Sequence, residues 1–150
     1  MPVSWEVAED EAFTRIAARG EAIARPELAH AVHVEVGGLS PARPYHYRFM
    51  AGAERSLAGR ARTTPAAGAS VARARFGVVG CQHYEQGYYT AYRRLAEDNP
   101  DFVFCYGDYI YEYRGNRVWN SADGPVENVR QHFGGEIYSL DDYRRRYAQY

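Results

Sequence analysis

The spacing of apolar residues changes near the middle of the chain, and this change constrains the fold more than any other feature. Apolar and polar residues alternate over residues 32–36 and again over residues 45–49, which is typical of strands with one buried face. Further along, short apolar runs flank a segment with helical spacing. We therefore predict two domains of different architecture, over residues 1–63 and 73–150, joined by a Thr-, Pro-, Ala- and Gly-containing linker over residues 64–72.

The first domain is predicted to be an immunoglobulin- or fibronectin-like β-sandwich. Between its two alternating segments, Leu39, Pro41 and Tyr45 have the spacing of a tyrosine corner, which ties such sandwiches together. Filling of the core by Tyr45 is the alternative. The chain opens directly on the alternating sequence V-S-W-E-V, so we expect the sandwich to lack its first strands.

The second domain begins with a strand, helix and strand pattern. Apolar runs at 75–80 and 101–106 flank helical spacing at 88–97, and Asn99-Pro100 is expected to end the helix. A crossover of this length predicts a βαβ unit with two parallel strands, buried on both faces.

The remainder is predicted to be a long polar loop over residues 113–138, followed by a helix. Ser139 and Asp142 have the spacing of a capping box that would begin this helix. The helix runs to the end of the chain, so we expect the chain to contain only the first part of its second domain. The buried side of the helix is predicted to carry Leu140, Tyr143 and Tyr147.

The composition of the chain limits the kinds of partner that it is expected to bind. The net charge of -1 gives no sign of a nucleic-acid-binding surface. The chain has no apolar run long enough to form a transmembrane segment, and its N-terminus lacks the regions of a signal peptide. Oligomeric state is not indicated by any of these features.

Residues with metal-binding side chains follow both predicted strands of the second domain. Cys81 comes directly after the first strand and Asp108 after the second, each preceded by a glycine. The carboxyl ends of parallel strands meet at one edge of a sheet, so we expect the thiol and the carboxylate to lie close together. Each has a simpler explanation by itself, since such a cysteine is often a small buried hydrophobe and such an aspartate can cap a loop.

Tyr111 is three residues beyond Asp108 and is expected to reach a cation held by that carboxylate. A phenolate is a hard anionic ligand, so ferric iron is the metal that these residues favour. A zinc-dependent hydrolase is a weaker alternative, because tyrosine is a poor zinc ligand and no His-rich spacing occurs. Cys105 lies inside the second strand and is predicted to be buried, not joined to Cys81 by a disulfide. Packing or loop positions are predicted for Tyr106, Tyr109 and Tyr113.

Two long stretches of the second domain, F-G-V-V-G-C-Q-H-Y-E-Q-G-Y-Y-T-A-Y-R-R-L-A-E and D-F-V-F-C-Y-G-D-Y-I-Y-E, closely resemble the PhoD-type alkaline phosphatases. This family is a branch of the metallophosphoesterases. Its N-terminal sandwich domain is similar to V-S-W-E-V-A-E-D-E-A-F and H-V-E-V-G-G-L-S-P-A-R-P-Y-H-Y-R-F. The resemblance therefore covers nearly the whole chain, and it implies that the second domain is the start of an α/β metallophosphatase domain.

The resemblance implies hydrolysis of phosphate monoesters, and of some diesters, with Fe³⁺ and Ca²⁺ as cofactors. Cys81, Asp108 and Tyr111 match positions of iron ligands in the family, and Asp108 would also contact calcium. The sequence G-D-Y-I-Y also resembles the G-D-x-x-Y of purple acid phosphatases, whose tyrosine binds ferric iron. Family members are usually exported through the twin-arginine route, so a secreted, extracytoplasmic location is expected.

The chain departs from related patterns in two ways. Cys81 stands where many metallophosphoesterases have the aspartate of D-x-H. The histidine of that motif, His83, is expected to be an exposed loop residue, and contact with the site is the alternative. The family's later ligand segments would lie after Tyr150, so we expect little or no phosphatase activity from this chain alone. A non-enzymatic binding or assembly module with a degenerate phosphatase domain is the alternative. Four residues of the long loop are candidates for contacts with phosphate, although a solvated loop face is the simpler expectation. These residues are Arg114, Arg117, Arg130 and His132.

Overall fold

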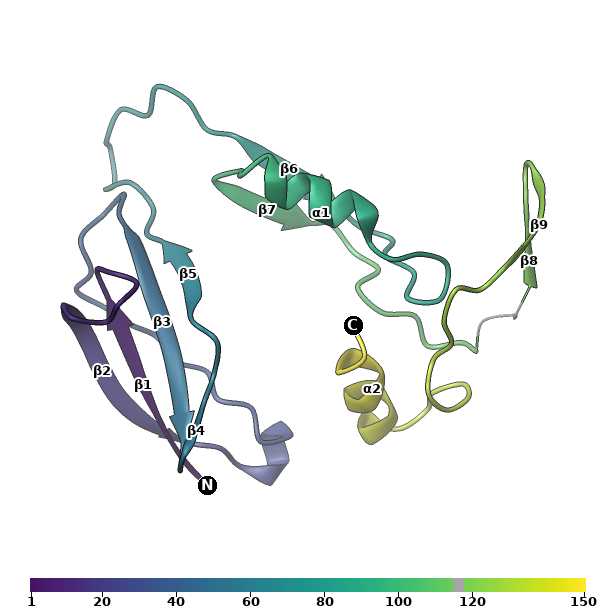
Figure 1. Cartoon of the computed structure of the whole chain (residues 1–150), viewed down its shortest axis with the longest axis horizontal. Helices are drawn as coiled ribbons and strands as arrows, with labels where there is room; N and C mark the ends of the chain where they lie inside the picture. Colours follow the sequence, from purple (N-terminus) through teal and green to yellow (C-terminus); the bar gives the residue numbers. More distant parts are fainter. Residues whose placement is uncertain (115–117) are drawn as a thin grey trace. The chain divides into compact units, whose positions relative to one another are not determined.

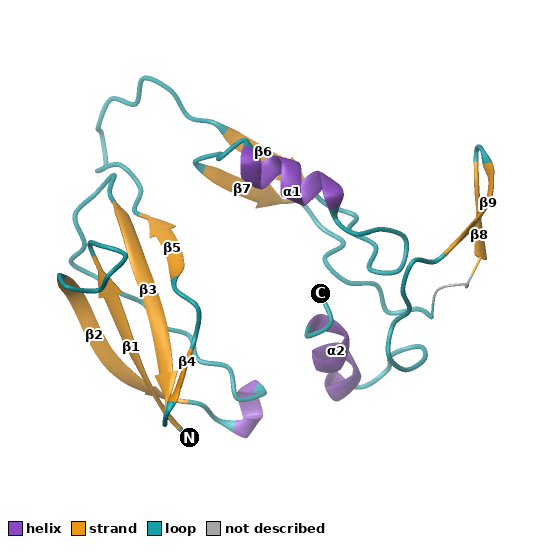
Figure 2. Cartoon of the chain, viewed as in Figure 1, coloured by secondary structure: helices purple, strands orange, loops and turns teal. Residues whose placement is uncertain are grey.

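The computed structural model describes residues 1–114 and 118–150, which form two compact units, Met1–Ala72 and Arg73–Tyr150 (Figure 1). Nine strands, two α-helices and one short 3-10 helix make up the regular structure of these residues (Figure 2). Neither α-helix has the length and apolar character needed to span a membrane within the described part of the chain.

The first unit contains a five-stranded antiparallel sheet (Figure 1). Its central strand β1 pairs on one side with β2 and on the other with β3, and β3 also pairs with β4 and β5. A 3-10 helix over Pro26–Leu28 follows β2. The strands are β1 (Pro2–Ala8), β2 (Ile16–Ile23), β3 (Pro44–Ala51), β4 (Glu54–Arg55) and β5 (Gly59–Arg62). The strands predicted around V-S-W-E-V and residues 45–49 are therefore confirmed.

Strand register decides which side chains of the first unit meet. Val3 and Val7 of β1 are buried. Between them, Glu6 lies directly opposite Arg48 of β3, and the Arg48 Nε donates to Glu6 Oε2 at 2.8 Å. The Arg48 guanidinium also lies 4.0 Å from the centre of the Phe13 ring. Directly opposed charged pairs of this kind stabilise a particular register.

Tyr45 makes the hydrogen bond that defines a tyrosine corner. Its side chain is 3 % exposed, and its phenol oxygen accepts a hydrogen bond from the backbone N–H of Ser40 at 2.9 Å. The tyrosine therefore anchors the preceding turn and does more than fill the core.

The strand predicted over residues 32–36 is not formed. These residues have no strand partner, although their burial still alternates: the three valines are half-buried and the intervening His and Glu are exposed. Val34 and Val36 line an apolar hollow together with Phe49 of β3. An extended segment can place every second side chain on a neighbouring surface without exchanging backbone hydrogen bonds. The described residues of this unit form one sheet, so the part of the sandwich prediction that is supported is its antiparallel strands.

The second unit begins with two parallel strands. β6 (Phe76–Val79) pairs with β7 (Phe102–Cys105), and α1 (Thr90–Glu97) lies between them in the sequence. Figure 2 shows α1 lying over the two-stranded sheet. The helix ends before Asn99-Pro100, as predicted. Val79 is paired with Cys105, so the two strands end level with each other.

The prediction that both faces of these strands are buried is wrong. A helix of eight residues covers little of a sheet, and Leu95 of α1 lies over the small Gly77, where a Cβ would come within 2.6 Å of the leucine side chain. Cys105, predicted to be core, is exposed and free, as is Cys81. The sheet residues that are more than half exposed are Phe76, Val78, Phe102 and Phe104.

The segment predicted as a loop over residues 113–138 contains a hairpin. Its antiparallel strands are β8 (Val118–Ser121) and β9 (Gly124–Glu127). The polar, glycine-containing composition of this region predicted only a loop. Glycine also suits the tight turn of a hairpin, so the same composition is compatible with two short strands.

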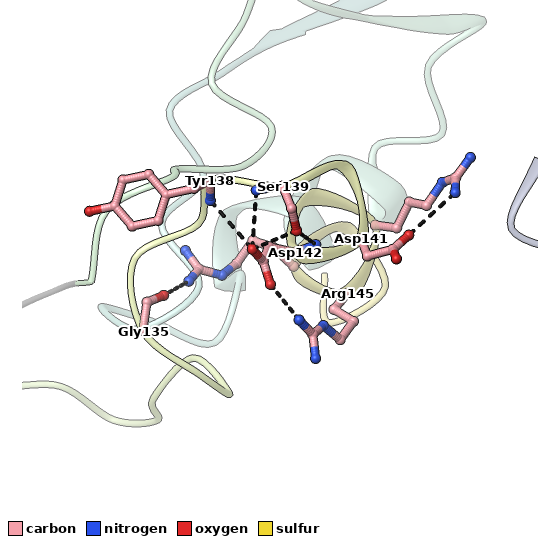
Figure 3. A network of polar contacts seen from close by, with 8 residues as sticks. Gly135, Tyr138, Ser139, Asp141, Asp142 and Arg145 are labelled. Atoms are coloured by element: carbon pink, nitrogen blue, oxygen red, sulfur yellow. Dashed lines mark hydrogen bonds and ion pairs between the residues drawn. The ribbon is translucent and has the colours of Figure 1, made fainter.

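The capping box predicted at the start of α2 (Leu140–Tyr147) is confirmed (Figure 3). Ser139 Oγ accepts a hydrogen bond from the Asp142 N–H at 3.2 Å, and Asp142 Oδ2 accepts one from the Ser139 N–H at 3.1 Å. Hydrogen bonds from Ser139 lower the pKa of Asp142 to about 2. Arg145 forms an ion pair with the same carboxylate.

The predicted buried side of α2 is wrong. Arg146 is the buried residue of this helix, at 1 % exposure. Its guanidinium donates to backbone carbonyl groups of irregular segments that the helix packs against, and a buried carbonyl requires such a donor. The residues predicted to be buried, which are all exposed, are Leu140, Tyr143 and Tyr147.

Candidate functional site

Cys81, Asp108 and Tyr111, the three predicted metal ligands, lie together beyond the ends of β6 and β7. The Cys81 thiol donates to Asp108 Oδ2 at 3.1 Å, and the Tyr111 phenol donates to the same oxygen at 3.3 Å. One carboxylate oxygen therefore receives both hydrogen bonds. If a cation displaced the thiol and phenol protons, a thiolate, a carboxylate and a phenolate would lie side by side as its ligands.

The backbone turns sharply at both strand ends. Cys81 has φ of 55° and Asp108 has φ of 53°, a left-handed conformation that residues other than glycine adopt at a cost. The Cys81 N–H donates to the Gly107 carbonyl at 3.2 Å, which ties the two turns together. This hydrogen bond joins the two strained turns, which hold the thiol and the carboxylate side by side.

Tyr106 brings a second phenol to the thiol. Its hydroxyl lies 3.7 Å from Cys81 Sγ, and the interaction with Cys81 is the main cause of a raised pKa for Tyr106. The ring packs over Gly80, where a Cβ would lie 2.5 Å from a ring carbon. From the sequence, Tyr106 was predicted only to pack beside the strand end. The glycine before Cys81 was the available signal, because no larger residue leaves room for the ring.

The Tyr111 phenol is held in its protonated form. Burial raises its pKa, and the neighbouring Asp108 carboxylate and Cys81 raise it further. A bound cation would have the opposite effect, because it stabilises the ionised forms of all three side chains. The three side chains accordingly form a network of hydrogen bonds.

His83 is not the exposed loop residue that was expected. It is half-buried, and its ring centre lies 5.2 Å from that of Tyr111 and 6.2 Å from that of Tyr113. Its Nδ1 accepts a hydrogen bond from the Glu85 N–H at 3.3 Å, and burial lowers its pKa. The histidine therefore packs against the loop that carries the phenol.

Arg130 is half-buried and His132 is buried, so neither lies on a fully solvated loop face. The Arg130 guanidinium lies 4.1 Å from the Tyr84 ring centre and 4.5 Å from that of Tyr89. His132 is buried, its Nε2 lies 3.2 Å from the Tyr150 hydroxyl, and burial is the main cause that lowers its pKa to about 4. Both side chains take part in the packing of the unit.

The other two loop arginines differ. Arg114 is exposed, as the solvated-face expectation requires, and Arg117 lies outside the described residues. Among the described residues, no group of three or more His, Cys, Asp and Glu side chains is arranged to hold a metal ion. The group around Asp108 contains two such side chains and completes its set of three with a tyrosine.

The excess of tyrosine forms a continuous cluster of rings beside this site. His83 and His132 link its two parts, with ring centres 6.1 Å apart. The irregular segments of the unit thus pack through aromatic contacts. The cluster's tyrosines are Tyr84, Tyr89, Tyr92, Tyr109, Tyr111, Tyr113, Tyr147 and Tyr150.

Two family models match the chain in succession. The model described as "PhoD-like phosphatase, N-terminal domain" matches residues 1–65, and the model described as "PhoD-like phosphatase" matches residues 76–150.

Comparison with whole proteins gives the same family. Alkaline phosphatase D of Bacillus subtilis (strain 168) is 51 % identical over 150 residues, which are 100 % of this chain and 25 % of that protein. A solved structure described as "Structure of PhoD" matches with a TM-score of 0.91 and 51 % identity, over 99 % of this chain and 28 % of that one. The chain thus spans about a quarter of the length of the relatives it matches.

Proposed function

The chain belongs to the PhoD-like phosphatases, and on that premise we propose that it supplies the first metal-binding part of an alkaline phosphatase. The substrates would be phosphate monoesters and some diesters. The observation that carries the proposal is the convergence of the Cys81 thiol and the Tyr111 phenol on one oxygen of Asp108, at 3.1 and 3.3 Å.

We assign Cys81, Asp108 and Tyr111 as ligands of Fe³⁺. The chemistry of the donors fits this ion, because carboxylate and phenolate oxygens are hard ligands and the thiolate adds a further negative charge. Ca²⁺ takes oxygen ligands, so Asp108, with two carboxylate oxygens, is the member of the three suited to contact both cations.

When bound, these cations would activate water and offset the negative charge that develops on the phosphate during in-line displacement. The role of the chain is to hold its three anionic side chains at fixed positions. Gln82 contributes to this, since its Nε2 donates to the Tyr109 carbonyl at 3.2 Å and so links the segments that follow the two strands.

The proposal extends to architecture and location. Residues 1–63 would be part of an immunoglobulin-like sandwich, for which the hydrogen bond from Ser40 to Tyr45 is the support. After a linker over residues 64–72, the parallel pair β6 and β7 would begin the sheet of a metallophosphatase domain. An extracytoplasmic location follows from the family and belongs to the same proposal.

Titration of the purified chain with Fe³⁺ under visible absorption spectroscopy tests the metal assignment. A tyrosinate bound to ferric iron should colour the protein. Tyr111→Phe should abolish the band, and Tyr113→Phe, a matched change in the same loop, should retain it. Cys81→Ala and Asp108→Ala should weaken iron binding roughly tenfold or more. A wild-type chain that stays colourless and metal-free would support the non-enzymatic binding module instead.

A second measurement concerns turnover. Calcium alone takes six to eight ligands, so three side chains cannot complete a site for several cations. We expect the 150-residue chain with iron and calcium to show little or no hydrolysis of a chromogenic phosphate ester. Robust turnover that is lost in Cys81→Ala or Asp108→Ala would contradict this expectation.

A further inference from the structure

The loop that carries Tyr111 contains no regular structure. It follows β7, and residues 106–114 form neither helix nor strand. Tyr111 must nevertheless keep its phenol 3.3 Å from Asp108 Oδ2. The position of the phenol therefore depends on contacts between this loop and other parts of the unit.

Three successive carbonyl groups of the loop accept hydrogen bonds from the C-terminal segment. Arg146 Nη1 donates to the Tyr111 carbonyl at 2.5 Å and to the Tyr113 carbonyl at 3.3 Å. Between them, the Glu112 carbonyl accepts from the Ile137 N–H at 2.9 Å. The backbone from Tyr111 to Tyr113 is thereby tied to α2 and to the segment before it.

Arg146 is itself held in place. It is 1 % exposed, and its Nη2 donates to the Gly135 carbonyl at 2.7 Å, a contact drawn at Gly135 in Figure 3. The helix that carries it begins at the capping box of Ser139 and Asp142. By contrast, the side chain of the neighbouring Arg145 is 65 % exposed. A buried guanidinium with partners in two segments is a rigid support for the loop.

We propose that Arg146 is a positioning residue for Tyr111, which holds the backbone of the loop so that the phenol lies beside Asp108. This inference rests on the proposed role of Tyr111 as an iron ligand. The planar fork of the guanidinium can serve several carbonyl groups at once, whereas a lysine ammonium is a compact charge on a flexible stem. Arg146→Lys should therefore keep the charge and lose the positioning.

The test is Fe³⁺ titration of the 150-residue chain, with visible absorption and with circular dichroism to verify folding. In Arg146→Lys, iron should still bind through Cys81 and Asp108, with roughly tenfold weaker affinity. The tyrosinate band should be weaker per bound iron or shifted in energy. Arg145→Lys is the matched control and should match the wild type in both readouts.

The outcomes separate the inference from the proposed function. A wild-type chain without a tyrosinate band overturns the proposed function and the inference together. A normal wild-type band that is unchanged in folded Arg146→Lys, with unchanged affinity, overturns the inference alone. A merely structural role for Arg146 would lower stability and leave the band of the folded fraction unchanged.

A measurement on the wild type covers the case in which Arg146→Lys does not fold. If the loop links the metal to the C-terminal segment, iron should slow hydrogen exchange of the Ile137 amide roughly fivefold or more. The amide of Val7 in the first unit provides the reference and should not change. Equal exchange of the Ile137 amide with and without bound iron would overturn the inference.

Discussion

The two units of this protein bury different kinds of side chain. The apolar residues buried in the first unit are Val3, Val7, Ala8, Ala24 and Tyr45. In the second unit, Ile137 is the buried apolar side chain among the described residues, and the buried polar or charged ones are Glu85, His132 and Arg146. The aromatic cluster of the second unit surrounds these polar groups, while the apolar faces of β6 and β7 remain exposed.

The difference follows from how the backbone of each unit is paired. In the first unit, β1 has a strand on each side, so its backbone groups are satisfied within the sheet and its inward side chains can be apolar. The second unit has long segments outside any strand or helix, and their buried polar groups need side-chain partners. Arg146 serves the carbonyl groups around Tyr111, and Glu85 Oε1 accepts from the His132 N–H at 2.9 Å.

The candidate metal site lies in the second unit, among its irregular segments. Its thiol and carboxylate follow strands directly, but left-handed turns and a loop without regular structure decide where all three side chains meet. Buried polar residues of the second unit therefore support a site that strand pairing alone could not build.

Removal of the Arg146 guanidinium should have the largest effect. Arg146→Met leaves three part-buried carbonyl groups without this donor, and we expect the free energy of unfolding of the second unit to fall by about 3 kcal/mol. Urea denaturation with hydrogen exchange of the α2 amides provides the measurement. Arg145→Met, at an exposed site, should change stability by no more than about 0.5 kcal/mol. Equal effects of the two changes would show that the stability of the second unit does not depend on its buried arginine.

Acid should weaken the second unit through His132. Burial, and after it the nearby Arg146, lowers its pKa from an ordinary value of 6.5 to about 4, with Glu85 partly offsetting these effects. The unfolded chain therefore takes up a proton first, so stability is complete above pH 6.5, falls towards pH 4 and levels off below it. We expect a loss of about 2 kcal/mol across this window.

The matched variant for this pH dependence is His132→Gln, which cannot titrate. Stability of the variant, measured by urea denaturation at a series of pH values, should vary less between pH 6.5 and 4. Some slope should remain from His83, whose pKa burial also lowers. The same slope in the wild type and in the variant would exclude His132 as its source.

Truncation of an apolar core residue should have the smallest effect of the three and should act on the first unit. Val7→Ala removes two buried methyl groups, which corresponds to about 1.5 kcal/mol. Hydrogen exchange of the β1 amides measures this loss. Val71→Ala makes the same change at an exposed position of the same unit and should have almost no effect. A similar cost at both positions would show that the sheet does not depend on this core.

Several elements could be predicted from the sequence because their signals are local. Alternation located β1 and β3, apolar runs located β6 and β7, and the spacing of Ser139 and Asp142 located the start of α2. The proximity of Cys81 and Asp108 was also predictable, since parallel strands of matched length end at the same edge. In contrast, alternation over residues 32–36 predicted a strand that is not formed. The valines of this segment are half-buried, but its backbone pairs with no other strand.

Local patterns in the sequence were enough to locate β1, β3, β6, β7 and the two α-helices, to identify the residues that follow the ends of β6 and β7, and to indicate the family. Which side chains are buried in the second unit depends instead on its tertiary packing. Arg146 lies 35 positions from Tyr111 in the sequence, and the helical spacing of α2 predicted Leu140, Tyr143 and Tyr147 as its buried side. The physical reason is that the hydrogen-bonding needs of an irregular backbone depend on what packs against it, which no local pattern of apolar residues records.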